Sequence, residues 1–210
     1  DEVLSERWPI FSDTISHIGH FQIRNRGTIG GSIAHFDPAA ELPALLVAMG
    51  GRLTLNNKRN KRIIQADDFL IGPFETVIEP DEILTEINFS LIPETSGYSV
   101  VEISRQEGAF AMAGAIAIIS TDLTEACTDV KLTLFGVSDV PYVCNNVVAE
   151  LIGTCPGEAD LREVATNSTK DIDYVSDIHA SKELRRHLAN VLVYRSLNEG
   201  YQRALKNIKK

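Results

Sequence analysis

The fold of this chain is decided by one glycine-rich segment, Ile23-Arg24-Asn25-Arg26-Gly27-Thr28-Ile29-Gly30-Gly31-Ser32. Three glycines and two small hydroxyl residues stand within positions 27–32. Glycine has no Cβ, so backbone N–H groups in such a segment can approach a phosphate closely and form an anion-binding concavity. A tight turn before a helix has the same composition. The glycines by themselves therefore leave a phosphate-binding loop and a plain turn both open.

A helix-start signal follows the glycines. Asp37-Pro38 is typical of an N-cap and a first helical residue. An apolar face follows, and Gly50-Gly51 ends the helix; the face is formed by Leu42, Leu45, Leu46 and Met49. Pro43 either kinks this helix or marks the start of its regular part.

The rest of the chain divides at Pro93-Glu94-Thr95-Ser96-Gly97, which has the composition of a linker. Before it, hydrophobic spacing predicts a helix over about 12–19, a hairpin of 53–55 with 62–65, and a strand over 83–91. We expect residues 1–92 to form a mixed α/β piece.

The pattern changes after the linker. Three strands are predicted over 98–105, 111–120 and 130–137, and the last alternates apolar and polar residues as a half-solvated antiparallel strand does. Helical spacing follows over 146–152, 158–170 and 181–206. The predicted fold class is therefore α+β, with a three-stranded antiparallel sheet and helices over residues 97–210.

Composition excludes several classes of function. The 210 residues are 44% hydrophobic and 23% charged, which is ordinary for a globular protein, and the net charge of −9 argues against a nucleic-acid partner. No apolar run reaches the roughly 18 residues of a membrane span, and no signal peptide is visible. Cys127, Cys144 and Cys155 show no metal-binding spacing, so we expect reduced thiols and a cytoplasmic location.

Conventional catalytic motifs are missing. The sequence has no Gly-Lys-Ser/Thr phosphate loop, no Gly-x-Ser-x-Gly and no His-Glu-x-x-His. His17 and His20 are three residues apart, but without an evident third ligand we interpret them as polar residues of a helix surface.

The glycine-rich segment, continued by Ala34-His35-Phe36-Asp37-Pro38-Ala39-Ala40-Glu41-Leu42-Pro43, resembles the second flavin-binding motif of the FAD-binding (medium) subunit of molybdenum hydroxylases. This family includes the carbon monoxide dehydrogenase and xanthine dehydrogenase flavoproteins. Residues 104–111 resemble the family's Arg-x-x-Gly-Asp-Phe-Ala segment, with Ala109 in place of the usual Asp, and residues 185–192 resemble its C-terminal helix. The resemblance covers nearly the whole chain in the family's order.

The resemblance implies an oxidoreductase component. The chain would bind FAD, accept electrons from 2Fe-2S clusters on a small subunit, and pass them to an acceptor such as a quinone, NAD or oxygen. A large subunit with molybdopterin would oxidise the substrate, and two copies of each chain would form the complex. The alternative is a flavin-free structural or docking module, or a fragment of that subunit.

The resemblance also implies individual site residues. The FAD diphosphate would be held by Thr28, Ile29, Gly30, Gly31 and Ser32. Glu41 would contact the nucleotide, although a solvated carboxylate in a first helical turn is equally compatible with the sequence. Leu84 and Ile18 would lie near the isoalloxazine ring or belong to the core.

Two further residues have alternatives of their own. Arg105 would place positive charge near the flavin and stabilise its reduced, anionic form, or would form a structural salt bridge. His35 faces the flavin or forms hydrogen bonds at the entry to a helix.

One family feature has no counterpart in the sequence. Family members carry a first glycine-rich motif of the Ala-Gly-Gly-x-Ser type, which cradles the other side of the diphosphate. Residues 1–27 resemble the stretch that follows this motif. The sequence therefore predicts one half of the expected FAD site.

Overall fold

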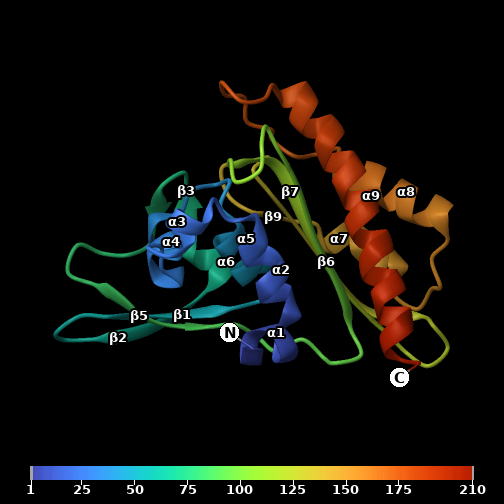
Figure 1. Cartoon of the computed structure of the whole chain (residues 1–210), viewed down its shortest axis with the longest axis horizontal. Coiled ribbons are helices and arrows are strands. Elements are labelled where there is room, and N and C mark those ends of the chain that lie inside the picture. The colour runs from blue at the N-terminus through green and yellow to red at the C-terminus, as the bar shows by residue number, and fades with distance from the viewer. Residues whose placement is uncertain (1, 210) are drawn as a thin grey trace.

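The computed structural model describes residues 2–209 and shows two main antiparallel sheets with helices packed around them (Figure 1). The first sheet has the strand order β2-β1-β5, and its strands are β1 (Arg52–Asn56), β2 (Lys61–Gln65) and β5 (Ile83–Asn88). The predicted hairpin is the pair β1–β2, with Leu53 opposite Ile64. A short pair, β3 (Leu70–Gly72) with β4 (Glu75–Thr76), lies beside it.

Six helices belong to this part of the chain: α1 (Glu2–Arg7), α2 (Pro9–His17), α3 (Phe21–Arg24), α4 (Ile29–His35), α5 (Glu41–Ala48) and α6 (Ala66–Phe69). The helix predicted over 12–19 is therefore α2, which begins earlier because Pro9 suits a first turn that needs no N–H donor. None of the described helices is both long enough and apolar enough to cross a membrane.

The helix start predicted at Asp37-Pro38 is wrong by three residues, because the N-cap is Ala40 and the first helical residue is Glu41. The Asp37 carboxylate accepts a hydrogen bond from the Ala39 N–H at 2.8 Å and closes a turn instead of capping a helix. Helix α5 begins at Glu41, so Pro43 lies in its first turn, where its missing N–H costs nothing. The proline therefore does not kink the helix.

The second sheet has four strands in the order β6-β7-β8-β9, whereas the sequence predicts three. These are β6 (Gly97–Ser104), β7 (Ala111–Thr121), β8 (Cys127–Phe135) and β9 (Tyr142–Val143). Strand β9 has no recognisable signal in the sequence, because a strand of two residues is too short to show an alternation pattern. The helices that follow are α7 (Asn145–Val148), a 3₁₀ turn η1 (Ala149–Leu151), α8 (Glu158–Ser168) and α9 (Lys182–Asn207).

Both faces of this second sheet are covered. On β7, small residues at 113, 115 and 117 pack toward the long helix α9, while Ile116 and Ile118 pack against α2 and α5. Alternate residues of a strand point to opposite faces, which explains why a nearly continuous apolar run forms this strand. The N-terminal helices and α9 therefore enclose one sheet between them (Figure 1).

Helix α9 lies very close to the first residue of β6. A Cβ added at Gly97 would overlap the Gly200 carbonyl oxygen and the Ala204 nitrogen, both of which are backbone atoms that cannot move independently. We expect Gly97→Ala to lower the free energy of unfolding by about 1–3 kcal/mol, because the helix must move away from the strand. Urea unfolding measures this change, and Gly157→Ala, on an exposed site with room for a Cβ, is the control. Equal stability of the two variants would contradict the close packing of α9 on β6.

Candidate functional site

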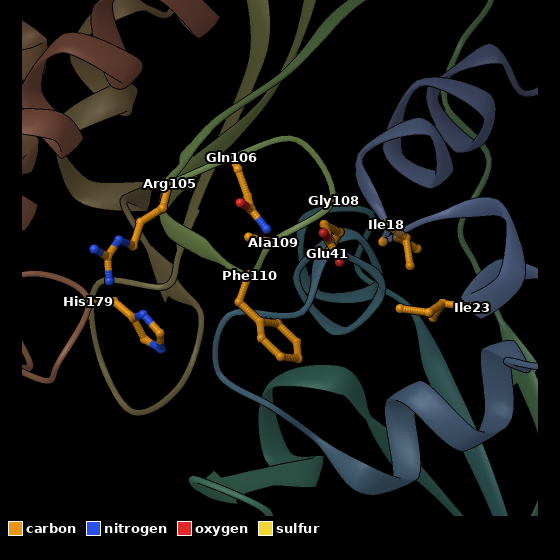
Figure 2. A pocket seen from close by; sticks show the side chains of 10 residues that line it. Ile18, Ile23, Glu41, Arg105, Gln106, Gly108, Ala109, Phe110 and His179 are labelled. Carbon is orange, nitrogen blue, oxygen red and sulfur yellow. The ribbon is translucent and has the colours of Figure 1, made fainter.

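A pocket of about 580 Å³ lies where the N-terminal helices meet the turn between β6 and β7. Three of the residues singled out in the sequence line it together: Ile18, Glu41 and Arg105. Figure 2 shows Arg105 and His179 toward one end of the view and Ile18 and Ile23 toward the other. The remaining lining residues are Gly19, Gln106, Gly108, Ala109 and Phe110. A volume in this range suits a small organic ligand.

Glu41 is buried in the wall of this pocket, with only 6% of its surface exposed. Burial raises the pKa of its carboxyl from 4.5 to about 7, and the nearby Asp37 charge acts in the same direction. The alternative of a solvated first-turn carboxylate is therefore wrong. The start of α5 favours a negative charge, but the loss of solvation outweighs that effect here.

A second buried carboxyl lies close to Glu41. The Glu102 side chain is 6% exposed, and the pKa of its carboxyl rises to about 8 through burial and the charge of Glu41. Glu102 Oε1 lies 3.7 Å from Nδ1 of His17, and Glu102 Oε2 has no hydrogen-bond partner among the described residues. Glu102 belongs to no motif in the sequence, and hydrophobic periodicity does not indicate that it lies in the same region as Glu41.

The turn between β6 and β7 supplies one wall. Gly108 takes a φ of +76°, a conformation that favours glycine, and a Cβ there would overlap the His20 ring. Phe110 follows with 63% of its surface exposed, and Figure 2 shows its ring extending into the space between the labelled residues. Arg105 makes no ion pair within residues 2–209, so the structure does not show the salt bridge considered as its alternative role.

His179 reaches the pocket from a loop in which no sequence motif indicates a site. The Asp177 carboxylate accepts hydrogen bonds from the N–H groups of His179 and Ala180, at 2.8 and 2.9 Å. Arg185 of α9 is 3% exposed and binds the same carboxylate at 2.6 Å. Arg185 also donates to the carbonyls of Met112 and Gly136, so it ties this loop to the second sheet.

The glycine-rich motif forms the first turn of α4 and not a turn before a helix. Thr28 is the N-cap, and its Oγ1 accepts a hydrogen bond from the Gly31 N–H at 3.0 Å. A Cβ at Gly30 would meet no atom within 4 Å, whereas one at Gly31 would overlap Thr28 Oγ1. The motif residues Thr28, Ile29, Gly30, Gly31 and Ser32 do not line the pocket described above.

The other residues named from the sequence lie elsewhere. Leu84 is half-buried on β5 and packs against the core of the first sheet, outside the pocket. His35 is exposed at the end of α4, with its ring 5.1 Å from that of Phe74. Residues 2–209 contain no group of three or more His, Cys, Asp or Glu side chains that could hold a metal ion.

Two family models match the chain. Residues 1–93 match the FAD-binding domain in molybdopterin dehydrogenase, and residues 98–200 match the CO dehydrogenase flavoprotein C-terminal domain. The chain therefore has the fold of a known class of flavin-binding oxidoreductase subunit.

Relatives of this class are similar over almost the whole chain. The alpha subunit of the 6-hydroxypseudooxynicotine dehydrogenase complex of Paenarthrobacter nicotinovorans is 33% identical, over 97% of this chain and 69% of its own length. The carbon monoxide dehydrogenase medium chain of Afipia carboxidovorans is 30% identical, over 97% of this chain and 70% of its own. The chain belongs to the family of FAD-binding medium subunits of molybdenum hydroxylases, as the resemblance predicted.

Solved structures agree with the fold. The crystal structure of quinoline 2-oxidoreductase from Pseudomonas putida 86 superposes with a TM-score of 0.92 at 28% identity, covering 98% of this chain and 71% of that one. A carbon monoxide dehydrogenase from Hydrogenophaga pseudoflava gives 0.91 at 25% identity, covering 97% and 70%. These matches confirm the α+β class.

The buried acids make stability depend on pH. Between the unfolded pKa of 4.5 and the folded value of about 7 at Glu41, the folded chain holds more protons, so stability falls as pH rises. We expect Glu41→Gln to remove part of this fall, on the order of 1–3 kcal/mol above pH 7. Urea unfolding across pH 5–8 tests this, with the exposed Glu107→Gln as control. If the free energy of unfolding of Glu41→Gln varied with pH as it does in wild type, folding would not raise the pKa of Glu41.

Proposed function

We propose that this chain binds FAD in the pocket and along the start of α4, and carries electrons between a partner's iron–sulfur clusters and an acceptor. The observation that carries the proposal is the pocket itself, which joins Ile18, Glu41 and Arg105 from three separate segments. Its apolar walls suit a flat ring system, and its three ionisable residues, Glu41, Arg105 and His179, suit the polar edge of that ring. A bound flavin supplies the ability to accept and release electrons, and the chain supplies its position and electrostatics.

The residues of this chain fit FAD at two places. The free space around Gly30 leaves its backbone open to a diphosphate, which Thr28, Ile29, Gly31 and Ser32 would also contact. At the pocket, Ile18 and Phe110 offer apolar surface, Glu41 a carboxyl group and Arg105 a positive charge. Leu84 stays in the proposal as a residue near the ring, reached from the first sheet.

The partners follow from the same proposal. The chain would dock with a small subunit that carries 2Fe-2S clusters and a large subunit that carries molybdopterin, with two copies of each chain. Its domains would divide into 1–92 for the flavin and 97–210 for the C-terminal part. Cys127, Cys144 and Cys155 are unbridged, which supports a cytoplasmic location.

The alternative is a docking module that holds no flavin, and one measurement separates the two. The visible absorption spectrum of the purified protein, with acid release and identification of any flavin, gives the FAD content. Stoichiometric FAD supports the electron-transfer proposal. Protein that stays colourless after incubation with FAD, alone and with its partner subunits, supports the docking module.

Gly30→Val tests the diphosphate contact. The added side chain stands in open space in the folded chain, so the fold stays intact while the backbone is pushed away from a phosphate. We expect FAD affinity to fall about 10- to 100-fold, measured by flavin fluorescence, with an unchanged circular dichroism spectrum. Gly157→Val is the matched glycine control. Gly31→Val is less informative, because it also disrupts the Thr28 cap. Normal FAD retention in Gly30→Val would remove this motif from the site.

Arg105→Gln tests the charge at the pocket. Without the guanidinium, the anionic reduced flavin loses stabilisation, so the reduction potential of bound FAD falls. We expect the ratio of reduced to oxidised flavin at a fixed potential to fall about tenfold. Spectroelectrochemical titration measures it, with the exposed Arg52→Gln on β1 as control. A potential equal to that of the control would place Arg105 away from the flavin.

A further inference from the structure

A chain of three ionisable side chains runs from solvent to the pocket. His17 ends α2 with 31% of its side chain exposed, and its Nδ1 lies 3.7 Å from Glu102 Oε1. Glu102 is buried on β6, three residues before Arg105, which lines the pocket together with Glu41. Glu41 lines the pocket wall. One end of this chain therefore meets water, and the other meets the ligand.

A structural salt bridge does not explain the two buried acids, Glu41 and Glu102. Two buried carboxylates next to each other repel, and Glu102 Oε2 finds no hydrogen-bond donor among the described residues. A buried, unpaired carboxylate is costly, so the pair keeps protons that isolated carboxyls would release. The burial that raises the pKa of both groups points the same way.

Strand β6 directs the Glu102 side chain toward α2. Tyr98 and Val100 of β6 pack toward α2, while Val101 and Ile103 pack toward α9. Glu102 continues the first series, so it faces α2 and His17. Ionisable groups on the neighbouring elements include Asp13 on α2, His20 beside Gly108, Asp37 before α5, and Arg105 and His179 at the pocket.

Asp13 is engaged elsewhere. Its carboxylate accepts a hydrogen bond from the Tyr98 hydroxyl at 3.0 Å and pairs with Arg203 of α9 at 3.3 Å. Since Asp13 is already bound on this side of α2, His17 is the imidazole through which Glu102 reaches solvent.

We propose that His17, Glu102 and Glu41 form a proton relay between solvent and the pocket, which supplies the proton taken up when a flavin bound there is reduced. This inference rests on the proposed FAD function. Two-electron reduction of a bound flavin, one electron at a time from reduced iron–sulfur centres, would also require at least one proton. Glu41 would supply that proton from its carboxyl O–H and become a carboxylate. Glu102 restores the Glu41 proton, and the His17 imidazole, which can accept and donate protons, restores Glu102 from water.

The presence of protonated carboxyl groups at Glu41 and Glu102 can be tested without flavin. Infrared spectra of the chain across pH 5–9 report the C=O stretch of protonated carboxyl groups. We expect wild type to keep a protonated-carboxyl band at pH 7, reduced in Glu41→Gln and Glu102→Gln and absent in the double variant. Glu107→Gln, exposed in the nearby turn, keeps the wild-type band. A wild-type spectrum with no protonated carboxyl at pH 7 would overturn the proposal.

The relay is tested in the FAD-loaded complex through the rate of proton-coupled flavin reduction. We expect the Glu41→Gln, Glu102→Gln double variant to keep the number of protons taken up at equilibrium and to slow this reduction about tenfold relative to wild type. His17→Gln should keep the wild-type proton count but slow proton-coupled reduction about tenfold. The exposed His187→Gln on α9 is its control.

The outcomes separate this inference from the function on which it rests. A wild-type complex that binds no FAD would overturn both. Bound FAD that is reduced at the same rate in wild type and the double variant would overturn the relay and leave the FAD function standing. A reduction rate in His17→Gln equal to that in His187→Gln would exclude His17 as the entrance for protons.

Discussion

The structure depends on the burial of both faces of strand β7. Its alternation of small residues toward α9 and of isoleucines toward α2 and α5 allows one sheet to serve as the core for two different sets of helices. The small side chains let the long helix approach closely, and the absence of a Cβ at Gly97 allows the same helix to touch the neighbouring strand. A half-exposed sheet would leave the N-terminal helices without an apolar surface to cover.

The pocket is a consequence of this arrangement. Because α2 and α5 cover one face of the sheet, the turn that joins β6 to β7 projects beside them, and its residues 105–110 meet Ile18 and Glu41. Arg185, buried in α9, positions a second wall of the pocket from the other face of the sheet. It binds two carbonyls and the Asp177 carboxylate, and thereby fixes the loop that carries His179 to the pocket.

Burial also gives the site its chemistry. Carboxyl groups at Glu41 and Glu102 have ordinary reference pKa values, and neither residue has a local sequence context that distinguishes it. Packing α5 against the sheet removes both from water and brings them together, which moves their titration toward neutral pH. The flavin proposal and the proton relay thus depend on the contact that also closes the core.

Local signals in the sequence determined the elements and the family. A nearly continuous apolar run located β7, hydrophobic alternation located β8, helical spacing located α9, and the motif from Ile23 to Pro43 indicated the flavin-binding family. The predicted start of α5 was wrong because an Asx turn and a helix cap use the same residue types. Strand β9 was not predicted because two residues show no periodicity. Only the tertiary structure joined Ile18, Glu41 and Arg105, added Phe110 and His179, and placed Glu102 beside His17. These groups are tens of residues apart in the chain, and periodicity describes neighbours along one element, not which elements pack together.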